Sequence, residues 1–440
     1  MHKTYYMLRR KLLLLAVTVL VCQAISAQYL MDMVDTSKDM GKGLLSLYTR
    51  LDKIRISGYI QPQFQVAQAK GAKGYFGGDF PDKVDNRFML RRGRIKFEYV
   101  HFAEKSGPSV QFVFQFDGTE RGVFIRDFWG RLFENKFQLF SFTAGMFARP
   151  ISYELNLSSS DRESPERGRM SQLLMKTERD LGAMISFEPR KKDHPLKHLK
   201  IDAGLFNGQG LPAAGDYDSH KDFITRVSIK PVALSKKMDF SAAVSYLNGG
   251  FLQNTKYIYH TVDIAGIKSY SIDSSLNNQG KIAPRIYYGS DAQLKIKTPA
   301  GSVELRAEYL QGKQTATHST SETPASLLTG TEGYYIRKFN GAYFYLLGNI
   351  FNPKHQLLIK YDWYDPNTEV SANDIGKAGT GLNAADIKYS TLGFGYNYYM
   401  NPNVKLLLWY EIIKNEKTQL PGYTSDLKDN VFTCRLQFRF

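Results

Sequence analysis

Three cationic side chains recur at every second position in one segment of the chain: Arg92, Arg94 and Lys96. Side chains alternate across a β-strand, so these cations would share one face, spaced about 6.6 Å apart along it. An arginine fork donates two parallel hydrogen bonds to a phosphate or carboxylate, and several cations in series can pass an anion along without trapping it. The spacing therefore predicts an anion-binding ladder on the polar face of a strand. The opposite, more apolar face would carry Arg91, Gly93, Ile95, Phe97 and Tyr99.

The same alternation places two further arginines on polar faces. Arg131 would share its face with Asp127, and Arg149 would share one with Thr143. Such cations can also serve only to offset acidic side chains on the same surface, of which Glu304 is an example. The arginines are therefore candidates either for anion binding or for charge compensation.

No group of residues indicates catalysis or metal binding. His194 and His198 flank Pro195 in a charged turn, and Asp216 and Asp218 are typical of a solvated loop. No Walker loop, His-Glu-x-x-His motif or Gly-x-Ser-x-Gly motif occurs. We therefore predict that the protein is not an enzyme and that it has no catalytic residues, no metal and no cofactor.

The elements that would position the cations are indicated by the last ten residues, which alternate in strict order. One face carries Phe432, Cys434, Leu436, Phe438 and Phe440, and the other carries Val431, Thr433, Arg435, Gln437 and Arg439. In a transmembrane barrel one such face meets lipid and the other meets a polar lumen, and the last strand pairs with the first. A strand that ends on Phe440 thus predicts an outer-membrane barrel, inserted by the barrel-assembly machinery; the alternative is a strand of a secreted sandwich.

Half-polar segments of period two recur from Ile54 onward, and the connections between them alternate in length. Short connections are expected at His101 to Gly107, Glu134 to Lys136, Arg190 to Lys197, Pro231 to Lys237, Thr298 to Gly301, Phe351 to Lys354 and Asn401 to Asn403. Long ones are expected at Gln68 to Lys83, Ala148 to Glu178, Asn207 to His220, Asn248 to Ala283, Gln311 to Thr331, Asp365 to Ala385 and Asn415 to Lys428. One connection, Gly118 to Gly122, is short where a long one is expected. This pattern predicts an all-β, antiparallel transmembrane barrel of about 16 strands, with long extracellular loops and short periplasmic turns.

The chain begins with two segments that differ from the barrel pattern. Residues 1–27 combine a basic start, an apolar run and a small-residue exit, which is the anatomy of a signal peptide. Residues 28–53 place apolar side chains at helical spacing and predict a short periplasmic helix. The barrel would then occupy residues 54–440.

Composition agrees with a strand-built membrane protein that attracts anions. Mean hydropathy is −0.35, and no stretch after the signal segment approaches the roughly 20 apolar residues of a spanning helix. The chain holds 58 Lys and Arg, four of them in the signal segment, against 42 Asp and Glu, so the remainder carries +12. We expect small anions and outer-membrane lipid as partners, and no nucleic acid.

Several blocks of sequence occur in the order and spacing of a known family. They are Gly145-Met146-Phe147-Ala148-Arg149-Pro150-Ile151-Ser152-Tyr153-Glu154, then Ser158-Ser159-Ser160, Glu166-Arg167, Arg179-Asp180-Leu181-Gly182 and Phe206-Asn207-Gly208. Together with Arg91 to Ile95 and Asp222 to Arg226, they resemble the phosphate-selective porin O and P family. The resemblance covers Ile54 to about Val227, and the rest of the chain matches only in general pattern.

The resemblance implies a homotrimer of sixteen-stranded pores in which the third long loop, Ala148 to Glu178, folds inward and narrows the channel. That loop would present Arg149, Arg162, Arg167, Arg169 and Lys176 to passing anions. It also carries nearly as many acids, namely Glu154, Asp161, Glu163 and Glu166. The cargo is therefore left open among phosphate, polyphosphate and mixed small solutes.

These observations predict a passive, anion-preferring diffusion channel in the outer membrane of a Gram-negative bacterium. The alternative is a barrel with a blocked lumen that captures a ligand, or adheres, through its extracellular loops.

Overall fold

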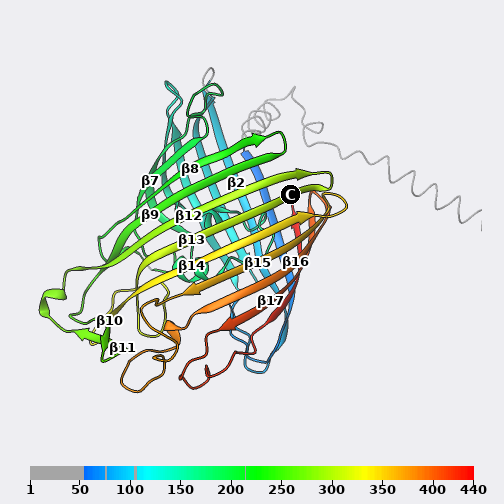
Figure 1. Cartoon of the computed structure of the whole chain (residues 1–440). Helices are drawn as coiled ribbons and strands as arrows, with labels where there is room; N and C mark the ends of the chain where they lie inside the picture. Colours follow the sequence, from blue (N-terminus) through cyan, green and yellow to red (C-terminus); the bar gives the residue numbers. More distant parts are fainter. Residues whose placement is uncertain (1–53, 75–76, 104–106, 214) are drawn as a thin grey trace, which may run out of the picture. The chain divides into compact units, whose positions relative to one another are not determined.

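The computed structural model describes residues 54–74, 77–103, 107–213 and 215–440. The expected signal peptide and N-terminal helix lie outside the described residues. Within the described residues, sixteen strands form one closed antiparallel barrel (Figure 1). These strands are β1 (Ile54–Ala67), β2 (Asn86–Ala103), β3 (Gly107–Thr119), β4 (Gly122–Phe133), β5 (Phe140–Ala148), β6 (Arg179–Phe187), β7 (Leu199–Phe206), β8 (Asp222–Ser235), β9 (Met238–Leu252), β12 (Ile282–Thr298), β13 (Gly301–Ala316), β14 (Tyr334–Asn349), β15 (His355–Asp365), β16 (Tyr389–Asn401), β17 (Val404–Asn415) and β18 (Val431–Arg439).

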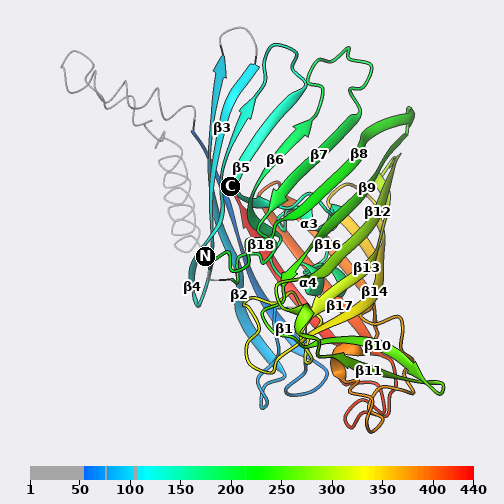
Figure 2. The ribbon, with the colours of Figure 1, turned by 90° about the vertical axis from the view of Figure 1, so that its left-hand side faces the viewer.

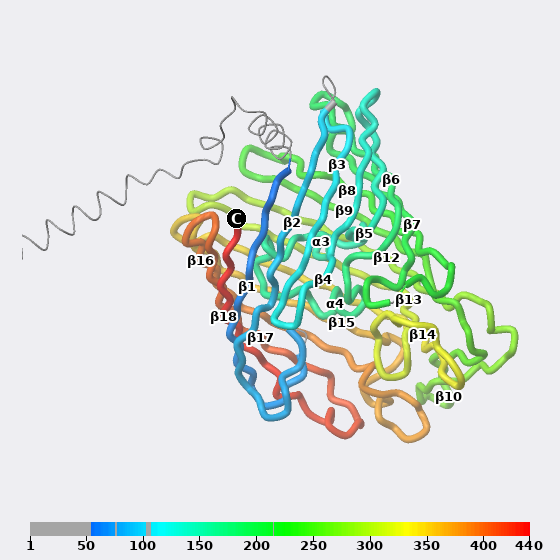
Figure 3. The backbone as a smooth tube through the Cα atoms, turned by 180° about the vertical axis from the view of Figure 1, so that it is seen from behind, coloured from blue at the N-terminus to red at the C-terminus, as the bar shows by residue number. Residues whose placement is uncertain are grey.

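The first and last strands close the barrel, as the terminal alternation predicts. Tyr59 lies opposite Arg439, and Ala67 lies opposite Val431, so β1 and β18 run antiparallel along most of their length (Figure 3). The backbone N–H of Phe440 also donates to the carbonyl oxygen of Gly58. The barrel therefore has no open edge at this junction.

The barrel is polar inside and apolar outside. In β1, the inward side chains of Gln61 and Gln63 are 1% and 3% exposed, whereas the outward Ile60 and Val66 are 46% and 40% exposed. This arrangement reverses that of a soluble protein and matches a wall that faces lipid. Among the described residues, no helix is long and apolar enough to cross a membrane.

Long and short connections alternate around the barrel as predicted, including the short extracellular turn between β3 and β4. Two details differ. Strand β8 continues past Pro231 to Ser235, so its periplasmic turn is tighter than expected. The loop expected from Asn248 to Ala283 contains a hairpin of β10 (Ile258–Ile264) and β11 (Ile267–Asp273). Strand β10 also pairs in parallel with β14, which extends the sheet beyond the barrel rim.

Four short helical elements complete the extracellular loops and the lumen. The helices α3 (Tyr153–Asn156) and α4 (Arg169–Leu174) belong to the loop between β5 and β6, and η2 (Leu276–Asn278) and η3 (Ala384–Asp386) belong to outer loops. Figure 2 shows α3 and α4 inside the ring of strands. The expected inward fold of the third long loop is therefore present in the structure.

Candidate functional site

The loop between β5 and β6, residues 149–178, crosses the lumen and is named here the inner loop. Its apolar side chains, Ile151, Leu155, Met170, Leu173 and Leu174, are buried in one cluster with residues of β7, β8 and β9. The hydroxyl of Ser245 on β9 donates to the carbonyl oxygen of Ile151. Burial of these side chains fixes one side of the inner loop to the wall.

The helix α3 is held at its start by a carboxylate from the wall. Glu308 on β13 accepts hydrogen bonds from the backbone N–H groups of Tyr153 and Glu154 at 3.1 and 3.2 Å. Glu154 in turn accepts from the N–H of Gly168 and the hydroxyl of Ser171. Burial alone would raise the pKa of Glu154, but the charges of Lys360 and Arg162 and these hydrogen bonds outweigh it and lower the pKa.

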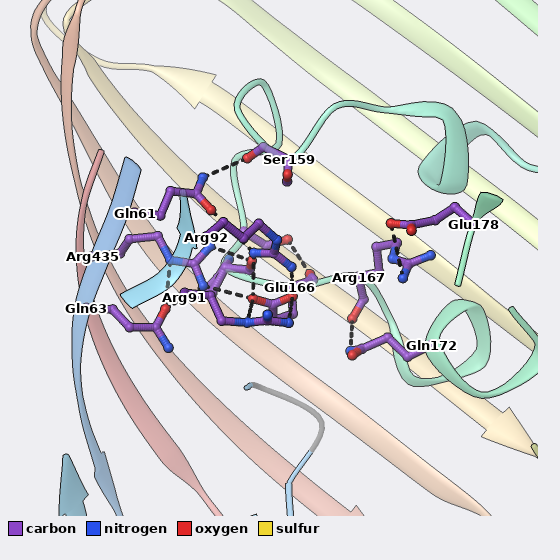
Figure 4. Close-up of polar contacts among 12 residues, drawn as sticks. Gln61, Gln63, Arg91, Arg92, Ser159, Glu166, Arg167, Gln172, Glu178 and Arg435 are labelled. Carbon is purple, nitrogen blue, oxygen red and sulfur yellow. Dashed lines mark hydrogen bonds and ion pairs between the residues drawn. The ribbon is translucent and has the colours of Figure 1, made fainter. Parts of the chain in front are cut away.

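Glu166 lies at the centre of the second attachment, which we call the glutamate clamp (Figure 4). Its carboxylate accepts from Arg91 at 2.9 Å, from Arg92 at 2.5 Å and from Arg435 at 2.9 Å. Burial would raise the pKa of Glu166, yet the three guanidinium groups hold that pKa well below its ordinary range. The clamp joins the inner loop to β2 and β18 with charge-assisted hydrogen bonds.

The clamp corrects one prediction from the sequence. Strict alternation places Arg91 on the outer, apolar face, but both Arg91 and Arg92 reach Glu166 in the lumen. Further along β2 the alternation holds, because Arg94 contacts Ser159 of the inner loop at 2.8 Å. The long side chain of Arg91 reaches the lumenal carboxylate, and alternation along the strand does not show how far a side chain extends.

The inner loop is bound to the opposite wall as well. Glu163 forms a bidentate pair with Arg306 on β13, with N···O distances of 2.8 and 2.9 Å. On the side of the glutamate clamp, Lys405 of β17, the neighbour of β18, also donates to the carbonyl oxygen of Arg162. The segment 158–166 is thus held from both sides of the lumen.

The fold has counterparts among solved structures. The outer membrane channel DcaP of Acinetobacter baumannii has 14% sequence identity and a TM-score of 0.51, covering 88% of this chain and 97% of that one. OprB of Pseudomonas putida has 10% identity and a TM-score of 0.52, covering 91% and 97%. OmpF of Salmonella typhi, in complex with daunomycin, has 11% identity and a TM-score of 0.50, covering 88% and 97%. The fold is that of an outer-membrane porin.

A closed barrel with an apolar exterior belongs in the outer membrane of a Gram-negative bacterium. At such low sequence identity the comparison concerns the fold alone. No protein-family model matches the sequence, and no curated protein matches it. The resemblance to the phosphate-selective porin O and P family thus stays a prediction.

In this porin fold the predicted ladder lines the wall, but each of its cations has an acidic partner. Arg92 binds Glu166, Arg94 binds Asp117 at 2.8 Å, and Lys96 binds Glu98 at 2.8 Å. Arg92 and Arg94 are also buried beneath the inner loop. The ladder therefore supports the loop and the wall as well as supplying positive charge.

The remaining predicted residues have varied surroundings. Arg131 donates to the Thr143 hydroxyl, and Arg149 donates to the carbonyl oxygens of Thr177 and Gly208. Burial lowers the pKa of Arg167 to about 10 despite its pairing with Glu178. The guanidinium of Arg169 lies 3.5 Å from the centre of the Tyr389 ring. The ammonium group of exposed Lys176 forms an ion pair with Glu322.

Arg162 differs from the other arginines of the inner loop. It is 3% exposed, and within the described part of the chain its guanidinium has no hydrogen bond or ion pair. Burial lowers its pKa, and the nearby charge of Arg92 lowers it further. Arg162 therefore adds a buried cation beside the glutamate clamp that interacts with Glu166 and Glu154 through charge alone.

Charge is distributed unevenly across the inner loop. On one side, Glu166 interacts with four arginines: Arg91, Arg92, Arg162 and Arg435. On the other side, Lys360 interacts with three acids: Glu154, Asp362 and Glu411.

Arg306 and Lys405 were not among the predicted site residues, although the alternation of β13 and β17 would have placed both in the lumen. The described residues contain no cluster that could hold a metal ion.

Two cavities lie on opposite sides of the inner loop. The extracellular one, of about 650 Å³, is lined in part by Arg91, Arg169 and Asp429. The periplasmic one, of about 470 Å³, is lined in part by Asp161 and Lys405. Residues of the inner loop line both cavities: Ser160 and Asp161 line the periplasmic one, and Arg169 and Gln172 line the extracellular one. The loop therefore narrows the lumen between its two ends.

We expect anion preference to increase when the pH falls below about 6, because burial raises the pKa of Asp429 to about 6. Protonation removes a negative charge from the extracellular cavity and leaves Arg169 without that counter-charge. Reversal potentials recorded on both sides of that pH would show the change, and Asp429→Asn should abolish it. If the Asp429→Asn variant kept the pH dependence of the wild type, Asp429 would not be the group whose protonation changes the ion preference.

The raised pKa of Asp429 should also make the stability of the protein depend on pH. The folded-state pKa of this carboxyl lies above the ordinary value of 3.8, so its contribution favours the folded protein at low pH and is lost as the pH rises towards about 6. Asp429→Asn should therefore raise thermal stability at neutral pH and leave it unchanged in acid.

Proposed function

We propose that this protein is a passive diffusion channel with a preference for small anions. The observation that supports the proposal is the inner loop, which narrows a closed barrel and holds four arginines around a single glutamate. Ions that cross such a constriction pass close to fixed positive charge, which lowers the barrier for anions relative to cations. The channel needs no catalytic group, metal or cofactor.

The proposed cargo, channel-lining residues and oligomeric state rest on the family resemblance together with the arginines around Glu166. The planar guanidinium fork suits phosphate, so phosphate or polyphosphate is the proposed cargo. The proposed channel-lining residues remain Arg92, Arg94, Lys96, Arg131, Arg149, Arg162, Arg167, Arg169 and Lys176. We also propose assembly as a homotrimer, after insertion through the barrel-assembly machinery.

The decisive experiment is the reversal potential of the purified protein in a planar bilayer under a KCl gradient. We expect a value on the anion-selective side, and we expect added phosphate to reduce the chloride current. Arg162→Gln should weaken both effects, because it removes a cation of the constriction that no hydrogen bond or close ion pair ties to an acid among the described residues. The matched control is Arg121→Gln, which removes the same charge from an exposed extracellular turn. A cation-selective channel would contradict the proposal.

A second function is favoured by the attachment of segment 158–166 to both walls. If those contacts close the lumen, the barrel would act by ligand capture or adhesion through its extracellular loops. Absence of any conductance from correctly folded protein would support this function and reject the channel.

A further inference from the structure

Five lysines are concentrated on adjacent periplasmic turns, in an arc that we call the lysine rim. They are Lys191, Lys192 and Lys197 in the turn between β6 and β7, and Lys236 and Lys237 in the turn between β8 and β9. These turns lie at the upper end of the barrel in Figure 1. The N–H of Lys230 on β8 donates to the carbonyl oxygen of His198, which joins the first turn to the strand that leads into the second. The rim therefore spans two neighbouring turns at one edge of the barrel.

The charges of the lysine rim are not neutralised by neighbouring acids. No hydrogen bond or ion pair joins any of the five ammonium groups to the residues that the structure describes. The nearby Glu188 is paired with Lys230, and the carboxylate of Glu134 accepts from the backbone N–H groups of Phe137 and Leu139. Asp193 is the remaining acid of the turn between β6 and β7. The lysine rim therefore carries a net positive charge.

Exposed apolar side chains accompany the lysines. Phe137 is 57% exposed, Leu196 is 48% exposed and Leu234 is 60% exposed. All three lie at the periplasmic limit of the lipid-facing wall. Side chains at this boundary can insert their apolar parts among acyl chains while lysine ammonium groups reach the phosphates of the headgroups.

The rim occupies only part of the periplasmic end. The turns between β14 and β15 and between β16 and β17 contain one lysine, Lys354. Arg439, near the second of these turns, is already bound to Asp161 and to the carbonyl oxygen of Pro402. The neighbouring turn between β4 and β5 contains Lys136, so the basic residues are concentrated on the arc from β4 to β9.

We propose that the lysine rim binds anionic phospholipid headgroups of the periplasmic leaflet. The charge of the rim is complementary to the headgroup phosphate, and its apolar neighbours match the acyl region beside it. Several lysines acting together attract an anionic lipid surface more strongly than a zwitterionic one. The proposal concerns the outside of the barrel and is independent of what crosses the lumen.

The test measures phosphatidylglycerol that stays bound to full-length protein purified from mixed micelles. A rim variant replaces Lys191, Lys192, Lys197, Lys236 and Lys237 with Gln. We expect bound phosphatidylglycerol per barrel to fall about twofold or more, with little change for phosphatidylcholine. Equal retention of phosphatidylglycerol by the rim variant and the wild type would overturn the proposal.

The matched control replaces five extracellular lysines with Gln: Lys70, Lys83, Lys377, Lys417 and Lys428. It changes the net charge equally and should retain lipid like the wild type. A rim variant with arginine at all five positions should also retain it. If inorganic phosphate displaces phosphatidylglycerol at equal concentration, the rim is a site for free anions and the proposal fails.

Folding of each variant is checked by the shift in electrophoretic mobility that heating produces in a folded barrel. If the Gln variant does not fold, salt titration of the wild type gives the answer. Raising the salt concentration should release phosphatidylglycerol and leave phosphatidylcholine bound, because salt screens exposed charges. Salt-independent retention would reject the proposal.

Discussion

Glu166→Gln is expected to shift the reversal potential further towards anions and to raise the conductance. The substitution removes the carboxylate that binds Arg91, Arg92 and Arg435, so three guanidinium groups lose their counter-charge. Breaking a buried ion pair by removing one partner costs about 3–5 kcal/mol. The attachment of the inner loop to β2 and β18 should therefore weaken, which widens the path as it becomes more positive.

Planar-bilayer recordings of single-channel conductance and reversal potential check both effects. Glu120→Gln is the control, because it removes the same charge from an exposed extracellular turn. In the wild type the pKa of Glu166 is held well below its ordinary 4.5. Its contribution to stability is present above that ordinary value and is lost only as the pH falls through the lowered pKa. The attachment of the inner loop through Glu166 should thus persist under mild acid. Unchanged selectivity in Glu166→Gln would show that the clamp lies away from the ion path.

Replacing residues 158–166 with glycine and serine is expected to raise the conductance several-fold. The segment keeps its length but loses the side chains that bind both walls, including the bidentate pair between Glu163 and Arg306. A sixteen-stranded barrel without such a constriction leaves a wide aqueous channel. Single-channel recording would give the size of the change.

A second variant separates anchoring from simple bulk. It keeps Glu163 and Glu166 and replaces only Asp161, Arg162 and Pro165 with glycine or serine, because the other four positions are already serine. We expect its conductance to return close to that of the wild type, because the two acids carry the contacts to opposite walls. Equal, high conductance in both variants would show that these acids do not hold the loop.

The periodicity of individual strands was sufficient to predict the barrel. Alternation in β18 gave the correct face for Arg435, and the order of short and long connections gave sixteen strands with the inner loop in its correct place. These features follow from a wall that must be apolar on one side and polar on the other. The polarity of each residue indicates whether its side chain faces lipid or the lumen, so the prediction does not depend on which distant residues it contacts.

The pairing of charged side chains in the lumen could not be predicted from the sequence. Glu166 is separated from Arg91 by 75 residues and from Arg435 by 269, and no local pattern links them. The contact of Arg91 with Glu166 depends on where the inner loop places that carboxylate. The pairing of β10 with β14 depends on how an extracellular loop folds back over the rim. Such contacts are set by tertiary packing rather than by spacing along the chain.

The glutamate clamp has a consequence for the order in which this protein can mature. Its ligands come from the second strand, the middle of the chain and the last strand. The clamp therefore cannot form until the whole polypeptide has been delivered and the seam between β1 and β18 has sealed. Contacts between such distant residues form slowly. Before that moment the inner loop is not attached to β2 and β18, although its apolar side can already pack against the other strands. The final narrowing of the channel therefore marks the end of biogenesis.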